Sequence, residues 1–298
     1  MASEMVLRGV YVAVVTPFDA DGNVAKGALE GLVHGYLDAG AAGIVALGTT
    51  GESSALDLDE KTDVINVCSA VCVERTAQLI VGAGTNNTAL SVAAAVSLRR
   101  VPGVTAVLAV VPYYVRPSQA GCIEHFRAVA GASPFPLVIY NIPYRTGRGL
   151  EAKTILELAA IGNIAGLKQA VGALDLDTLE VLAEAPEGFA VLGGDDAFLY
   201  PTVLMGGAGT IAASANVLTD RFVAMIECGL AAKLEEGRAH AEALLPVVKR
   251  LFAEPNPAVI KGVLHAQGRI PTPDLRLPMT AASSTAVEAA LAAIEAAG

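Results

Sequence analysis

The chain has 298 residues, a formal net charge of −10 at pH 7 and 53% hydrophobic residues. The acidic balance, with no basic cluster longer than Arg99-Arg100, excludes a nucleic-acid binder. No apolar run reaches the roughly 18 residues of a membrane span, and Met1 to Arg8 lacks the apolar stretch of a signal peptide. These features predict one cytoplasmic α/β domain.

Short apolar runs alternate with Ala- and Leu-rich stretches along the chain. The predicted strands are Val10–Val15, Gly43–Leu47, Leu79–Ala83, Ala106–Val111, Leu137–Tyr140, Ala165–Lys168, Ala190–Leu192 and Thr210–Ala213. The predicted helices include Lys26–Ala39, Asp59–Ala77, Thr88–Arg99, Glu151–Ala160 and Leu174–Ala185. Continuous apolar strands are typical of a parallel sheet buried on both faces. Eight such strand–helix units favour a closed (β/α)8 TIM barrel over an open sheet.

A doubly wound sheet is the nearest alternative fold. It requires a Gly-x-Gly-x-x-Gly loop after the first strand, where this chain carries Thr16-Pro17-Phe18 instead. We therefore divide the chain into a barrel over residues 1–230 and a helical C-terminal extension over residues 231–298, packed on the barrel.

The cysteines do not predict a metal site. Cys68 and Cys72 lie four residues apart on a predicted helix, and Cys122 and Cys228 stand alone. No histidine lies at a spacing that would complete a zinc site. We interpret the thiols as small buried residues in a reducing compartment, and we predict neither a metal nor an organic cofactor.

In a barrel of this class, functional groups follow the C-terminal ends of the strands. The second predicted strand is followed by Gly48–Ser53, in which glycines flank Thr49 and Thr50. The amides and hydroxyls of such a loop can cradle a carboxylate. The alternative interpretation is an ordinary turn before a helix.

Phenols and an arginine follow the next strands. Tyr113 and Tyr114 come after the fourth strand, Tyr140 ends the fifth, and Arg145 follows it closely. A phenol can relay protons, and an arginine can bind a carboxylate bidentately. The alternatives are an aromatic plug or subunit contact for the paired tyrosines, and a solvated loop charge for the arginine.

Lys168 is the strongest candidate for catalysis. Of seven lysines, it alone ends an apolar strand that faces the predicted site. Burial disfavours the ammonium form, and the free amine is the nucleophile that attacks a ketone. The alternative is a buried ion-pair partner. Near the ends of strands seven and eight, glycines let a ligand approach the backbone, and we interpret Asp195 as a helix N-cap.

Together, these groups predict imine chemistry on a 2-oxo acid. Its carbonyl condenses with Lys168, and the protonated imine acts as an electron sink. The methyl carbon then loses a proton, which the phenols and a threonine shuttle, and the resulting enamine attacks an aldehyde.

The chain resembles the dihydrodipicolinate synthase / N-acetylneuraminate lyase family from about residue 10 to residue 278. The matching motifs are Gly48–Ser53, Pro112–Gln119, Tyr140–Gly147, Gly166–Lys168, Gly194–Asp196, Gly206–Asn216, Glu254–Pro257 and Leu275–Thr280. The resemblance implies a (β/α)8 barrel with a helical extension, a class I Schiff-base aldolase, and a homotetramer built as a dimer of dimers.

The resemblance also implies roles for single residues. Lys168 matches the lysine that forms the imine with pyruvate, and Tyr140 matches the phenol beside it. Thr49 and Tyr114 match the proton relay, in which Tyr114 reaches across a tight dimer interface. The positions that match substrate-binding residues are Thr50 for the pyruvate carboxylate, Arg145 for the second substrate, and Gly194 and Ile211 through their backbones.

Within the family, Arg145 and Thr49-Thr50 favour the synthase branch. That branch condenses pyruvate with L-aspartate 4-semialdehyde to 4-hydroxy-tetrahydrodipicolinate in lysine biosynthesis. Gln169 and Tyr144 depart from it, since synthases usually carry an acidic residue and Ser there. The departures favour the alternative, a 2-keto-3-deoxy sugar acid aldolase, an N-acetylneuraminate lyase or a related hydro-lyase. We expect Gln169 to remove a charge beside the imine and Tyr144 to alter the aldehyde pocket.

A third hypothesis is a non-catalytic oxo-acid-binding protein, which the intact set of site residues opposes. The family's lysine feedback site is matched by Asn86 and Tyr113. Leu58, Lys61 and Leu90 stand where lysine-sensitive members carry polar or acidic groups. We therefore predict weak or absent inhibition by lysine.

Overall fold

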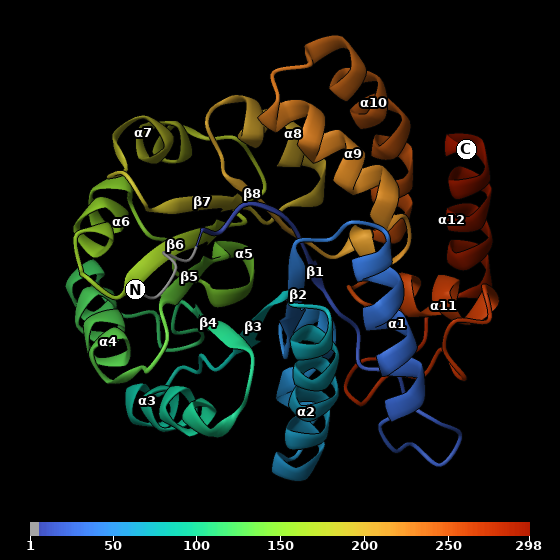
Figure 1. Ribbon diagram of the computed structural model, residues 1–298, viewed down its shortest axis with the longest axis horizontal. Helices are drawn as coiled ribbons and strands as arrows, with labels where there is room; N and C mark the ends of the chain where they lie inside the picture. Colours follow the sequence, from blue (N-terminus) through green and yellow to red (C-terminus); the bar gives the residue numbers. More distant parts are fainter. Residues whose placement is uncertain (1–5) are drawn as a thin grey trace.

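The computed structural model describes residues 6–298, whose strands close into a parallel barrel (Figure 1). The strands are β1 (Gly9–Ala13), β2 (Gly43–Ala46), β3 (Gln78–Gly82), β4 (Val104–Val110), β5 (Leu137–Asn141), β6 (Ile164–Gln169), β7 (Ala190–Gly193) and β8 (Gly209–Ala212). Each strand pairs with its neighbours in chain order, and β8 pairs with β1. The predicted TIM barrel is confirmed.

Helices surround the barrel on all sides in Figure 1. They are α1 (Lys26–Asp38), α2 (Leu58–Glu74), α3 (Thr88–Ser97), α4 (Gln119–Ala132), α6 (Ala152–Ala159), α7 (Leu176–Glu184), α8 (Leu199–Leu204) and α9 (Thr219–Leu230), with a short α5 (Pro143–Thr146) after β5. Some begin at caps that the sequence carries. In α2, Asp57 and Glu60 form a reciprocal capping box, with bonds of 2.8 and 2.9 Å.

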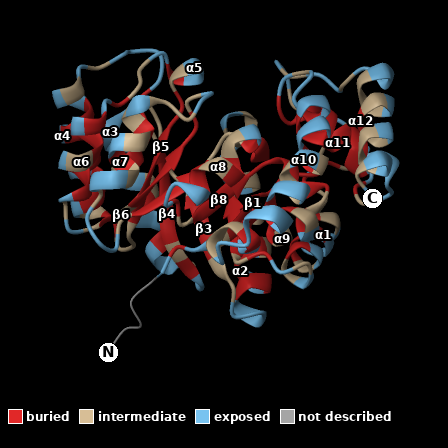
Figure 2. Ribbon diagram, turned by 90° about the horizontal axis from the view of Figure 1, so that it is seen from above, coloured by how far each residue is buried: buried red, intermediate tan, exposed pale blue. Residues whose placement is uncertain are grey.

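The alternation of side chains along each strand produces two apolar layers. Tyr11, Val45, Ile80 and Val138 belong to the cluster that fills the barrel. The intervening side chains, such as Leu167, pack outward against the helices. Figure 2 shows this pattern as an almost continuously buried set of strands beneath partly exposed helices. A residue's place in the strand alternation therefore decides whether it can reach the barrel interior.

Three helices follow the barrel: α10 (Leu234–Leu251), α11 (Ala258–Ala266) and α12 (Ser284–Ala297). The first packs against α9 and α12, and α11 contacts the single turn η5 (Ser214–Asn216) that follows β8. Figure 2 shows α11 and α12 at one side of the barrel. Among the helices that the structure describes, none combines the length and apolar character needed to cross a membrane.

Candidate active site

Lys168 lies inside the barrel near the C-terminal end of β6. It is 7% exposed, and it pairs in register with Tyr140 of β5. Its Nζ lies 4.3 Å from the centroid of the Tyr140 ring. Burial lowers the pKa of the lysine from 10.5 to about 8, although Asp196 and Asp195 oppose this change. The amine is therefore far easier to deprotonate than a solvated lysine.

Tyr140 and Thr49 lie together beside this amine. Burial raises the pKa of the Tyr140 phenol to about 12, and the neighbouring Thr49 side chain opposes the rise. The phenol therefore keeps its proton at neutral pH and can donate a hydrogen bond. A protonated phenol next to a free amine is suited to moving a proton at the reacting carbon.

The loop after β2 holds both threonines in a constrained backbone. It forms two short turns, η1 (Thr49–Gly51) and η2 (Ser53–Ala55). Positive φ angles flank the first turn, 56° at Leu47 and 53° at Glu52. Non-glycine residues seldom adopt this conformation, and it is concentrated at functional sites. Thr50 is 3% exposed, and its hydroxyl accepts a hydrogen bond of 3.0 Å from the Asn256 amide.

Gly194 lies directly against the Lys168 side chain. A Cβ added there would lie 2.8 Å from Cε of the lysine, so a side chain at this position would displace the lysine. The Gly194 amide donates to the Gln169 carbonyl at 2.8 Å. Ile211 of β8 is fully buried in the interior cluster. Gly194 therefore borders the amine, and Ile211 belongs to the same interior cluster as Tyr140.

Arg145 and Tyr144 lie at the rim, on α5. Both side chains are exposed, and the Arg145 guanidinium lies 5.9 Å from the Tyr144 ring centroid. Within residues 6–298, this arginine forms no salt bridge. It is near enough to Lys168 to lower the pKa of the amine. An unpaired guanidinium at the rim of an imine site is available to an incoming carboxylate.

Asp195 occupies the predicted N-cap position, before the short turn η4 (Asp196–Phe198), but its side chain makes no capping bond there. One carboxylate oxygen instead accepts from the Tyr144 hydroxyl at 3.2 Å, and the other accepts from the Gly172 amide. Asp195 therefore links the segments that follow β5, β6 and β7.

The effect of Gln169 on the imine remains a prediction, and its side chain lies on the other face of β6 from Lys168. Lys168 points inward, so the next residue of β6 points outward. The Gln169 amide accepts from Asn141 at 3.0 Å and donates to Thr178 at 2.9 Å. Both partners are buried, and the Thr178 hydroxyl in turn donates to the Asp175 carboxylate at 2.5 Å. The amide therefore joins a hydrogen-bond network between β5, β6 and α7 that ends on a carboxylate.

Tyr114 is not brought to the site within this chain. Its side chain is 87% exposed, and its backbone has a φ of 72°. An aromatic residue held at positive φ and pointing into solvent is strained without local packing to justify it. The geometry is compatible with a role outside this protomer.

Three buried polar residues at this side of the barrel were not singled out from the sequence. Asn256 contacts Thr50, and Lys261 of α11 forms a 2.8 Å ion pair with Glu52. The lysine is fully buried on α11, although lysines on helices are usually solvated. The Glu254–Pro257 motif was a signal for Asn256, but nothing local marked Lys261, because its partner is more than two hundred residues away.

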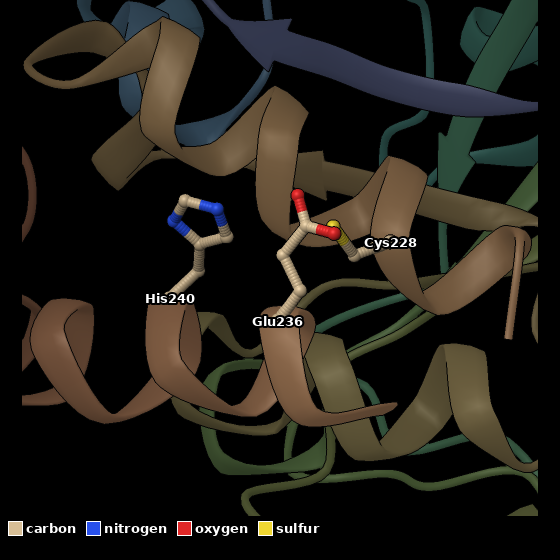
Figure 3. A group of neighbouring side chains, drawn as sticks. All are labelled: Cys228, Glu236 and His240. Carbon is tan, nitrogen blue, oxygen red and sulfur yellow. The ribbon is translucent and has the colours of Figure 1, made fainter. Parts of the chain in front are cut away.

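A second cluster of potential ligands lies outside the barrel, between α9 and α10 (Figure 3). Donor atoms of Cys228, Glu236 and His240 lie within 4.8 Å of one another. The Glu236 carboxylate is 3.7 Å from the Lys233 ammonium. Burial, together with the Glu236 carboxylate, raises the pKa of the Cys228 thiol. We assign this protonated, locally ion-paired group to helix packing.

The free amine inside the barrel, the neighbouring phenol and the hydroxyl-bearing loop define a (β/α)8-barrel lyase of the Schiff-base aldolase class. Residues 6–297 match the model of the Dihydrodipicolinate synthetase family. The chain belongs to this family.

Similar proteins support the same assignment. The chain is 40% identical to the 4-hydroxy-tetrahydrodipicolinate synthase of Laribacter hongkongensis, over 96% of this chain and 98% of that protein. It is 38% identical to the enzyme of that name from Neisseria meningitidis serogroup C, over 98% and 99% of the two chains. A solved structure of the chloride-inhibited dihydrodipicolinate synthase of Acinetobacter baumannii, complexed with pyruvate, is 34% identical with a TM-score of 0.94, covering 98% of this chain and 99% of that one.

Proposed function

We propose that this protein is a 4-hydroxy-tetrahydrodipicolinate synthase that condenses pyruvate with L-aspartate 4-semialdehyde. The observation that carries the proposal is the buried Lys168 amine, with its pKa lowered to about 8, beside Tyr140 and below an unpaired Arg145. The near-full-length relatives named for this activity support the choice of substrates. The family's other activities, on sugar acids and sialic acid, lack this support.

The proposed reaction begins when Lys168 Nζ attacks the keto carbon of pyruvate. Loss of water gives a protonated imine. The methyl carbon gives up a proton, which Tyr140 and Thr49 transfer, and an enamine forms. This carbon attacks the aldehyde and forms the new C–C bond. Attack of the second substrate's amine on the imine carbon closes the ring and releases Lys168, so the two substrates give the cyclic product and one water.

The remaining site residues divide between the two substrates. We assign the pyruvate carboxylate to Thr50 and its loop, and the carboxylate of the second substrate to Arg145. Gly194 and Ile211 border the imine through their backbones. No residue in this sequence of steps requires a metal or an organic cofactor, because the imine itself is the electron sink.

We also propose a homotetramer, built as a dimer of dimers, and a cytoplasmic location. The exposed, positive-φ Tyr114 supports a partner subunit that receives this phenol. The four free thiols, all of which are buried, support a reducing compartment. Sedimentation of the wild type and of Tyr114→Phe, together with their turnover, tests whether the phenol acts across an interface.

Regulation by lysine remains a prediction. Leu58 is 79% exposed and Leu90 is 60% exposed, and neither can pair with an ammonium group. The Lys61 side chain would repel one. We expect turnover to be insensitive to lysine at low millimolar concentration, and a clear inhibition curve there would contradict this expectation.

The central experiment measures the consumption of pyruvate with L-aspartate 4-semialdehyde, coupled to a reductase that accepts the cyclic product. Efficient turnover is expected. If pyruvate and borohydride give a covalent adduct but the aldehyde is not consumed, the second substrate is different. A sugar-acid aldehyde would then be tested, since Tyr144 narrows the rim where synthases usually carry Ser.

A further inference from the structure

A buried asparagine of the C-terminal extension contacts the loop that we assign to the pyruvate carboxylate. Asn256 follows α10 and is 8% exposed, and its Nδ2 lies 3.0 Å from the Thr50 hydroxyl oxygen. Both side chains are buried, and the residues are 206 positions apart in the chain. The contact therefore joins the extension directly to the rim of the barrel.

The polarity of this hydrogen bond determines what Thr50 can offer a substrate. A threonine hydroxyl has one proton to donate and two lone pairs. When the Asn256 amide donates to one lone pair, the hydroxyl proton is free to point elsewhere. If Asn256 accepted this hydrogen bond instead, the Thr50 hydroxyl would donate its only proton to the amide oxygen. Only its lone pairs would then face the anionic substrate.

We propose that Asn256 is a positioning residue for pyruvate recognition, which orients the Thr50 hydroxyl proton toward the substrate carboxylate. The inference rests on the proposed function, since it specifies how that site recognises its oxo acid. It also gives the extension a catalytic purpose beyond covering the barrel.

The same loop is held at a second point by the extension. Glu52 receives a 2.8 Å bond from the ammonium of Lys261 and a 2.9 Å bond from the backbone amide of Arg276. Both cations lie against the Phe18 ring, at 4.1 and 4.5 Å from its centroid. This second anchor fixes the backbone of the loop, while Asn256 fixes the direction of one hydroxyl. The two contacts therefore predict different consequences when they are removed.

The test is a double-mutant cycle between Asn256→Asp and Thr50→Val. A carboxylate of the same shape can only accept, so it should take the Thr50 proton away from pyruvate. We expect the KM for pyruvate to rise by roughly ten- to a hundredfold, the range for losing a hydrogen bond to a charged group. The KM for the aldehyde and the kcat should change much less. In the Thr50→Val background, Asn256→Asp should change the pyruvate KM less than about twofold, since coupled residues are not additive.

Asn163→Asp is the matched control for structural damage. Asn163 directly precedes β6, at the opposite end of that strand from Lys168. Its amide donates to backbone carbonyls at the end of α4 and in the loop before β5, including Ala130 at 2.8 Å. It should lower stability without changing the pyruvate KM. If Asn256→Asp does not fold, Asn256→Ala and Asn256→Ser replace it in the same cycle, with a raised pyruvate KM expected from the loss of the donor.

Two results would overturn the inference. One is an unchanged pyruvate KM in a folded Asn256 variant. The other is an equal rise in both Thr50 backgrounds, which would mean that Asn256 does not act through Thr50. Failure of the proposed function is distinguishable from both, because the wild type itself would then either give no borohydride-trapped pyruvate adduct or form that adduct without consuming L-aspartate 4-semialdehyde.

Discussion

Two buried lysines in this protein have similar surroundings but different partners. Lys168 and Lys261 are both almost inaccessible, and each ammonium lies over an aromatic ring, at 4.3 Å from Tyr140 and 4.1 Å from Phe18. Burial lowers the pKa of both amines. Of the two, within residues 6–298, only Lys261 has a carboxylate in direct contact, that of Glu52 at 2.8 Å.

The contrast shows that burial alone does not make a lysine nucleophilic. In the Lys261 pair, the contact and its hydrogen bond favour the charged ammonium, so this amine serves as a cation that fixes a loop. Near Lys168, Asp195 and Asp196 act only through space, because their oxygens are engaged by Tyr144, Gly172, Ala213 and Ser214. Neither carboxylate therefore pairs directly with Lys168, and its amine is available to react.

The largest effect should come from Lys168→Ala. Without the amine no imine can form, so we expect turnover to fall by at least about 10⁴-fold, to the background left by binding alone. No borohydride adduct with pyruvate should be detected by mass spectrometry. Lys153→Ala removes an exposed lysine of α6 and should leave both measurements unchanged. Substantial turnover by Lys168→Ala would refute the mechanism.

The next largest effect should be a difference in the free energy of unfolding between variants of the two lysines. Lys261→Met leaves Glu52 charged and buried without its partner, which should lower the free energy of unfolding by about 3–5 kcal/mol. Lys168→Met breaks no direct pair, so its stability should be equal to or above that of the wild type. Urea unfolding of both variants measures the difference. The double variant Glu52→Gln/Lys261→Met should recover part of the loss, and equal losses in the two single variants would remove the distinction between the lysines.

The sequence predicted the location of Lys168 but not the burial of Lys261. Lys168 ends a predicted apolar strand, so local pattern and strand polarity together placed it at the catalytic rim. Lys261 sits in a helix that looks ordinary, and its burial depends on packing against a loop 209 positions away. The hydrogen-bond partners of Asp195 and Gln169 were not predictable for the same reason, because they come from other strands, helices and loops.

A third prediction concerns pH. With a pKa of about 8, about a tenth of Lys168 is neutral at pH 7 and about half at pH 8. The initial rate of adduct formation with pyruvate should therefore rise about fivefold from pH 7 to 8 and less than about twofold from pH 8 to 9. An amine with the ordinary pKa would gain about tenfold in each interval. A continued tenfold rise would show that Lys168 is paired or solvated, as a surface lysine is.

The smallest effect should come from charges that act on Lys168 through space. Asp195 raises the pKa of the amine, and Arg145 lowers it. Asp195→Asn should therefore move the midpoint of adduct formation to lower pH, and Arg145→Gln should move it to higher pH. Tyr144→Phe removes the 3.2 Å bond to Asp195 without changing any charge near the amine at neutral pH, so it is the control for a disturbed rim.

Shifts of opposite sign in the two charge variants, with little shift in Tyr144→Phe, would show that these charges set the pKa of Lys168. Shifts of the same sign in all three variants would mean that rim structure, rather than charge, controls Lys168. The difference in reactivity between Lys168 and Lys261 would then be due to packing and not to neighbouring charges.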